Sequence, residues 1–167
     1  SIRLSTKSIL SCTALSEYLR IEGYFLSSLK WLEKAFQAHG EGHDRLLVNR
    51  GNLYLKSHLF EDAFDDFSRA HEINPNNVNA CNGLGISWLN MDEIDKAKAM
   101  YDSLLKKKRL AILLNNSGIT KSYMALRERQ ERNTTNENKY NLLAIQDFEK
   151  ATKGKKKVVR DAQGMGY

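Results

Sequence analysis

Residues 44–77 read DRLLVNRGNLYLKSHLFEDAFDDFSRAHEINPNN, and they predict a pair of short helices. Small and aromatic residues recur at steps of three and four along each half, as one face of a helix requires. Gly51 and Ala63 leave room for the two helix axes to approach, while Tyr54 and Phe67 fill the space beside them. Pro75 cannot continue the second helix, so the pair ends there in a turn.

The same pattern returns further along the chain. The first copy has Gly51, Tyr54, Ala63, Phe67, Ala70 and Pro75, and the second has Gly85, Trp88, Ala97, Tyr101, Leu104 and Arg109. Every member of the second copy follows its counterpart at the same interval, and four of these six pairs are identical or aromatic in both copies. A fixed period of this length is typical of stacked helical hairpins, and the spacing resembles the tetratricopeptide repeat, whose unit is about 34 residues long.

Fainter copies extend the pattern in both directions. The upstream copy consists of Ser16, Ser28, Leu32 and Ala35, and the downstream copy of Gly118, Ala144, Phe148 and Ala151. We therefore predict an array over residues 9–152, with units at about 9–43, 44–77, 78–111 and 112–152. The resemblance implies an all-α fold, a right-handed α-solenoid of stacked helix-turn-helix hairpins in which each unit buries its apolar face against its neighbours.

The fourth unit differs from the middle two in the distance between its helices. The stretch from the glycine to the first alanine runs from Gly51 to Ala63 in the second unit, but from Gly118 to Ala144 in the fourth, which is more than twice as long. The extra residues fall in the polar stretch RERQERNTTNENKY, residues 127–140, which has no apolar periodicity and predicts an inserted mobile loop. Residues 153–167 are expected to form a basic capping helix or tail.

The charge is unevenly spread along the 167 residues. Residues 1–104 hold 11 Lys and Arg against 14 Asp and Glu, whereas residues 105–167 hold 15 against 6. The basic clusters at 106–109 and 153–160 predict contact with nucleic acid, an acidic protein or an anionic membrane surface. The alternative is that they are solvated helix ends, because cations near a helix C-terminus are favoured by the macrodipole without any ligand.

Chemistry-bearing motifs are missing from the sequence. Cys12 and Cys81 form no C-x-x-C pair, and no phosphate-binding glycine loop occurs. His39 and His43 are four residues apart, but the glycines between them indicate a turn there and no third ligand follows. We therefore expect no catalytic activity, no metal and no cofactor, and an interaction protein instead.

The first helix of each predicted hairpin carries a series of amides. An Asn side chain offers an acceptor and two donors, which match the backbone groups of an extended peptide. In a stack of hairpins these first helices line the inner, concave wall. The candidate peptide-binding residues are Arg45, Asn49, Asn52, Asn79, Asn82, Ile86, Asn115, Asn116, Ile119 and Tyr123, with Val48 adding apolar contact. The alternative is that the amides satisfy neighbouring backbone between repeats.

A narrower resemblance covers residues 79–105 and 113–126. The runs NACNGLGISWLNMDEIDKAKAMYDSLL and LLNNSGITKSYMAL look like bacterial tight-adherence pilus assembly lipoproteins, although Ser117 replaces a usual leucine. This resemblance implies an adaptor in a pilus or secretion machine, in the periplasm or at the outer membrane, and a cytoplasmic protein otherwise. The cations that bind acidic chaperone tails in one subgroup of the family are missing, since Asn79, Asn82, Ile112 and Asn116 stand there.

Other interpretations stay open beside the peptide-binding scaffold. One is a basic-surface binder of nucleic acid or another anionic partner, and another is a regulatory segment of a larger protein. Exposed ends of a solenoid also predict possible homo-oligomers.

Overall fold

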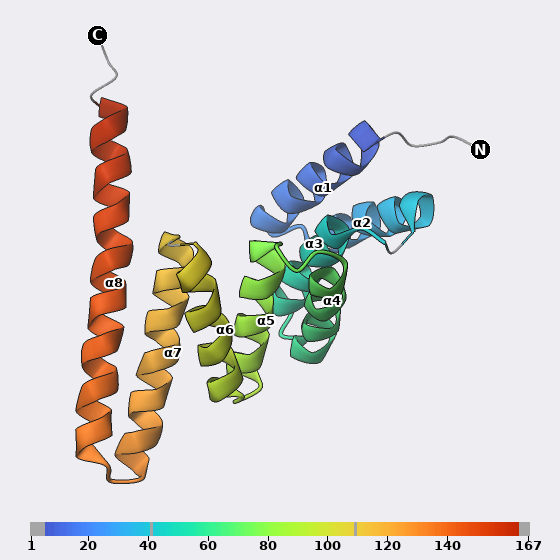
Figure 1. Ribbon diagram of the computed structural model, residues 1–167. Helices are drawn as coiled ribbons and strands as arrows, with labels where there is room; N and C mark the ends of the chain where they lie inside the picture. Colours follow the sequence, from blue (N-terminus) through green and yellow to red (C-terminus); the bar gives the residue numbers. More distant parts are fainter. Residues whose placement is uncertain (1–5, 41, 109, 164–167) are drawn as a thin grey trace. The chain divides into compact units, whose positions relative to one another are not determined.

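The computed structural model describes residues 6–40, 42–108 and 110–163, and every element in this part of the chain is an α-helix (Figure 1). The helices are α1 Thr6–Ile21, α2 Phe25–His39, α3 Asp44–Lys56, α4 Phe60–Ile73, α5 Val78–Asn90, α6 Ile94–Lys107, α7 Ala111–Gln130 and α8 Thr134–Gln163. Consecutive helices pack as hairpins, which confirms the predicted all-α hairpin fold.

The chain divides into two compact units, Ser1–Met91 and Asp92–Tyr167. Unit 1 holds α1 to α5 and unit 2 holds α6 to α8. The predicted repeat at 78–111 spans the boundary between them, and the repeat limits remain a prediction.

The hairpin turns share one backbone feature. Gly23, between α1 and α2, has a φ of 85°, and His58, between α3 and α4, has a φ of 59°. Asp92 precedes α6 with a φ of 61°, and Arg132 lies between α7 and α8 with a φ of 58°. A side chain is uncommon in this left-handed region. The interval from His58 to Asp92 equals the interval between the matched glycines of the two repeats, so the turn geometry follows the repeat period.

The polar stretch of residues 127–140 is not a loop, so that prediction is wrong. α7 continues to Gln130 and α8 begins at Thr134, which leaves only a short turn between them. Two polar contacts join the lengthened helices. Arg129 lies 2.7 Å from Glu137 in an ion pair, and Asn136 donates a hydrogen bond to Glu128 at 3.1 Å.

The extra residues are shared equally between the two helices. Gly118 precedes the turn residue Arg132 by 14 positions, whereas Gly51 precedes the turn residue His58 by 7. On the other side of the turn, Ala144 follows Arg132 by 12 positions, whereas Ala63 follows His58 by 5. Each helix therefore gains about two full turns. Whole turns keep the facing sides of α7 and α8 in register, so the hairpin grows without a loop.

The basic C-terminal stretch begins as part of α8. This helix runs without interruption to Gln163, so residues 153–163 continue α8 and do not form a separate capping helix or an irregular tail. Residues 164–167 lie outside the described residues.

One aromatic ring organises the packing of unit 1. Phe67 of α4 is fully buried, and the backbones of Gly51 in α3 and Gly83 in α5 lie against its ring. A methyl group added at Gly51 would lie 2.9 Å from the ring, and one at Gly83 would lie closer still. In unit 2, a methyl group added at Gly118 would lie 2.7 Å from the ring of Phe148. These contacts confirm that the predicted small residues allow the helices to approach.

Two hairpins carry a buried carboxylate at the same repeat position. Asp66 of α4 accepts hydrogen bonds from the Arg50 guanidinium of α3 at 2.8 and 2.7 Å. Asp147 of α8 accepts one from Ser117 Oγ at 2.8 Å and one from Lys121 Nζ at 2.5 Å, both in α7. Sequence analysis missed both ties. The signal was an Asp-Phe pair that recurs in the second helix of both hairpins, at 66–67 and 147–148.

Asp44 joins the start of α3 to the turn between α4 and α5. Its Oδ2 atom accepts hydrogen bonds from Asn74 Nδ2 and Asn77 Nδ2, both at 2.8 Å. Burial alone would raise the pKa of Asp44, but the bonds from Asn77 and Asn74 and from the Arg45 backbone N–H outweigh it and lower that pKa.

This lowered pKa predicts a loss of unit 1 stability in acid. The stabilisation is present above the unfolded pKa of Asp44 and is lost as the pH falls through the folded value, below about 4. In the Asn74→Ala/Asn77→Ala variant, a carboxyl NMR titration should show the pKa of Asp44 rising toward its ordinary value. The stability of this variant should fall less steeply in acid. An unchanged titration of Asp44 in the variant would contradict this prediction.

Candidate functional site

In unit 1, α3 packs against α1 and α5 and also against α2 and α4. The helices α1 and α3 are the first helices of two successive hairpins, and α5 follows them, which is the order that the inner wall of the predicted array requires. The six candidate residues of unit 1 all lie on α3 and α5.

The candidate residues of unit 1 differ in their exposure and in the contacts they make. Asn49 donates from Nδ2 to the Thr13 backbone oxygen at 3.1 Å, so it ties α3 to α1, as the alternative interpretation of the amides predicts. Asn52 is half-buried and Asn79 is exposed. The other candidates of unit 1 are Arg45, which is exposed, and Asn82 and Ile86, which are half-buried. Val48 is buried in the core.

In unit 2, apolar side chains line one face of α7. Ile112, Ile119, Tyr123 and Leu126 are separated by seven, four and three residues and are 36 to 53% exposed. We call these four residues the α7 stripe. Sequence analysis proposed Ile119 and Tyr123 but not the other two, although their helical spacing is the signal that finds them. Large apolar side chains exposed in a row along a helix are a common sign of an interaction surface.

The two amides of α7 lie in different surroundings. Asn115 is exposed beside the α7 stripe, and its Nδ2 lies 3.5 Å from Asn116 Oδ1. Asn116 is buried and hydrogen-bonds the fully buried Tyr101 of α6. Burial raises the pKa of Tyr101, and the bond from Asn116 partly offsets this increase. Asn116 therefore serves the packing of α6 on α7.

The histidine pair lies in a turn, as the glycines predicted. His39 ends α2 and His43 precedes α3, with their ring centroids 5.9 Å apart and the rings nearly perpendicular. Within the described residues, no three His, Cys, Asp or Glu side chains gather in a way that could hold a metal ion. No helix in the described part of the chain combines the length and apolar character needed to cross a bilayer.

One protein family matches the part of unit 1 that holds α3 and α4. The family described as tetratricopeptide repeat matches residues 45–77, which cover α3, α4 and the turn that follows. The likeness to the tetratricopeptide repeat family is therefore shown over this stretch. This stretch contains the close approach of Gly51 to the Phe67 ring and the Arg50–Asp66 ion pair. It also contains the candidate residues Arg45, Asn49 and Asn52.

The relatives extend the likeness beyond this repeat. A tetratricopeptide repeat-containing protein of Methanocaldococcus jannaschii is 24% identical over 103 residues, which cover 62% of this chain and 18% of that protein. This chain therefore spans less than a fifth of the length of that curated relative.

Two solved structures have similar folds. The first tetratricopeptide domain of Spaghetti, bound to an HSP90 peptide, superposes with a TM-score of 0.63 at 17% identity, covering 75% of this chain and 99% of that one. MamA from Desulfovibrio magneticus RS-1 gives a TM-score of 0.62 at 13% identity, covering 98% and 99%. These likenesses show that the tetratricopeptide hairpin fold extends beyond the matched repeat.

Proposed function

We propose that this protein is a non-catalytic interaction scaffold that binds a peptide or a protein partner. The observation that carries the proposal is the α7 stripe, because four exposed apolar side chains in one row give a partner a continuous surface to bury. The Spaghetti domain was solved with a peptide bound, which supports the same mode of action for this chain.

In unit 1, the proposed contacts are polar. Asn52 and Asn79 present side-chain amides on the inner helices, where they can pair with the backbone N–H and C=O groups of an extended peptide. Arg45 is exposed on the same helix as Asn52 and adds a cation for an acidic side chain. Asn49 and Asn116 are already engaged in packing, each within its own unit, so we assign them a packing role.

The proposal names no particular cellular machine. The comparisons lend no support to the narrower resemblance to pilus assembly lipoproteins. A role as an adaptor in a pilus or secretion machine would have to be shown from the partner itself.

Peptide selection with the full chain as target tests the scaffold. Peptides selected from a random displayed library should bind at least about tenfold more weakly to the Ile119→Ser/Tyr123→Ser variant, which loses two apolar anchors. The matched control is Leu142→Ser/Ile145→Ser on α8, where the replaced side chains are 57 and 53% exposed. This control should bind within about twofold of the wild type. Affinities are measured by fluorescence anisotropy.

The polar contacts of unit 1 are tested separately. A selected peptide that shifts the amide signals of α3 and α5 should bind more weakly to the Asn52→Ala/Asn79→Ala variant. Selection of no peptide, or equal binding by the α7 stripe variant and its control, would overturn the scaffold proposal.

A further inference from the structure

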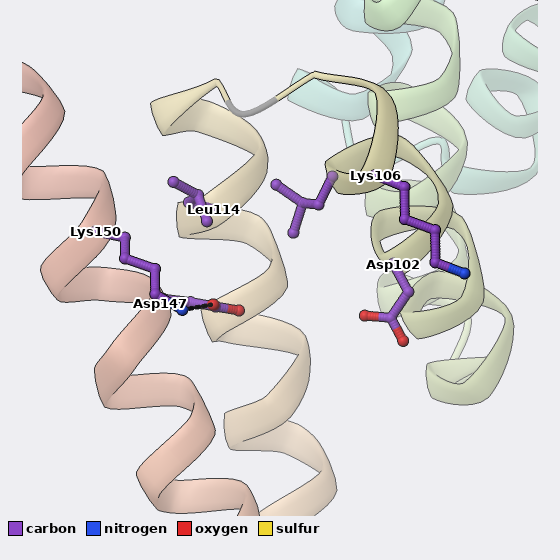
Figure 2. Close-up of a pocket in the computed structure, with 6 residues that line it drawn as sticks. Asp102, Lys106, Leu114, Asp147 and Lys150 are labelled. Atoms are coloured by element: carbon purple, nitrogen blue, oxygen red, sulfur yellow. Dashed lines mark ion pairs between the residues drawn. The ribbon is translucent and has the colours of Figure 1, made fainter.

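A pocket of about 560 Å³ opens between α6 and α8 in unit 2, and Figure 2 shows the residues that line it. Asp102, Leu105 and Lys106 come from α6, Leu114 from α7, and Asp147 and Lys150 from α8. The volume lies in the range of about 300 to 1,000 Å³ that is typical of ligand pockets. Both α6 and α8 pack on α7, which contributes Leu114 to the lining of the pocket.

The two carboxylates of the pocket are already neutralised. Asp102 accepts a hydrogen bond from Lys98 Nζ at 2.6 Å. Asp147 is held by Lys121 Nζ at 2.5 Å and by Ser117 Oγ at 2.8 Å. Neither carboxylate therefore needs a cation from a ligand.

The two lysines of the pocket are not neutralised in the same way. Lys150 Nζ forms an ion pair with Asp147 Oδ1 at 4.0 Å (Figure 2), which is longer than a hydrogen bond, and the Lys150 side chain is 57% exposed. Lys106 is exposed on α6 and has no ion pair with another residue of the described chain. The charge that the pocket offers to a ligand is therefore positive. The whole of unit 2 has the same sign, since residues 92–167 hold 17 Lys and Arg against 10 Asp and Glu.

This pocket is separate from the proposed scaffold surface. An α-helix turns by about 100° per residue, which places Leu114 on the side of α7 opposite to the α7 stripe. A ligand in the pocket would therefore contact a different face of unit 2 from a partner on the stripe.

We propose that this pocket binds an acidic peptide segment in which an apolar side chain stands beside a carboxylate. The apolar side chain lies on Leu105 and Leu114, and carboxylates of the peptide pair with Lys106 and Lys150, whose flexible stems let the ammonium groups reach them. The wholly polar backbone of a nucleic acid has no group to place on the apolar side chains of Leu105 and Leu114. An apolar lining with one cation on each wall matches a peptide better than a polyphosphate.

A designed peptide tests this pocket directly. The probe is the labelled peptide Gly-Ser-Glu-Leu-Glu-Ser-Gly, titrated into the ¹⁵N-labelled full chain at an ionic strength of about 50 mM, where charge contacts are weakly screened. We expect saturable amide shifts around Leu105, Leu114 and Lys150. The Lys106→Glu/Lys150→Glu variant should bind at least about tenfold more weakly. The matched charge control, Lys96→Glu/Lys139→Glu, replaces two exposed lysines outside the pocket and should bind within about twofold of the wild type.

Three further measurements decide between this pocket and its rivals. The peptide with serine in place of leucine should bind more weakly, because it cannot use the apolar lining. The Ile119→Ser/Tyr123→Ser variant, which alters the α7 stripe, should bind the probe with the wild-type affinity. Binding of the probe in the pocket is therefore tested independently of partner binding on the α7 stripe. The proposal is overturned by tighter binding of an oligothymidylate than of the peptide, by equal binding of the charge-reversed variant, or by no saturable shift up to about 5 mM peptide.

Discussion

Replacing Gly83 by alanine is expected to destabilise unit 1 by about 3 kcal/mol or more. The added methyl group would overlap the ring of Phe67, which is fully buried and also lies against Gly51. Because Phe67 is surrounded by helix backbone, the ring has no room to move aside without shifting α4 against α3 or α5. Urea unfolding followed by the fluorescence of Trp31 and Trp88, both in unit 1, measures the loss.

The control for this prediction is Gly42→Ala. Gly42 is exposed, and an added methyl group there meets no atom within 4 Å. That variant should change the stability by less than about 0.5 kcal/mol. A double-mutant cycle with Phe67→Leu should show coupling, because the smaller side chain leaves space for the methyl group. Gly83→Ala unfolding at the same urea concentration as the wild type would contradict the packing described here.

Replacing Asp147 by alanine is expected to destabilise unit 2 by about 3 to 5 kcal/mol. The substitution leaves the Lys121 ammonium, whose side chain is 12% exposed, without its carboxylate partner, and leaves Ser117 Oγ without its acceptor. Both tryptophans lie in unit 1, so their fluorescence does not report on unit 2. The loss of stability is measured instead by residue-resolved hydrogen exchange, which should become faster in α7 and α8.

Two companion variants separate the buried charge from helix propensity. Glu149→Ala changes an exposed carboxylate of α8 and should cost less than about 0.5 kcal/mol. The Lys121→Met/Asp147→Leu variant replaces the pair by apolar side chains and should recover most of the stability, because no buried charge is then left unpaired. If the exchange rates in α7 and α8 are the same in Asp147→Ala and in the wild type, the contacts of Asp147 with Lys121 and Ser117 do not stabilise this hairpin.

Much of the hairpin architecture could be predicted from the sequence because it depends on local spacing. Gly51 and Phe67 stand where a close helix approach needs a small residue and a ring, and the structure brings them into contact. Ile119 and Tyr123 were predicted from the helix face that they occupy, and both are exposed. Whether they bind a partner stays a prediction.

The sequence-based predictions that were wrong or missing share one cause. Contacts between helices, and not local composition, decide the structure at these positions. Residues 127–140 have the polar composition of a loop, yet the extra residues on each side complete whole helical turns and extend the hairpin. Asn116 has the polarity of a surface residue but lies against Tyr101. The burial of Asp147 has no local signal apart from the recurring Asp-Phe pair, because its partners lie 26 and 30 residues away in α7.

The amino-acid sequence alone is enough to set the repeating pattern of helices and turns, because small, aromatic and turn residues act through short-range geometry. Which polar side chains are free depends on the tertiary structure. Asn49 and Asn116 are used inside the fold, whereas Asn79 and Lys106 face solvent. The physical reason is that the burial and pairing of a side chain depend on the neighbouring helix, whose residues lie far away in the sequence.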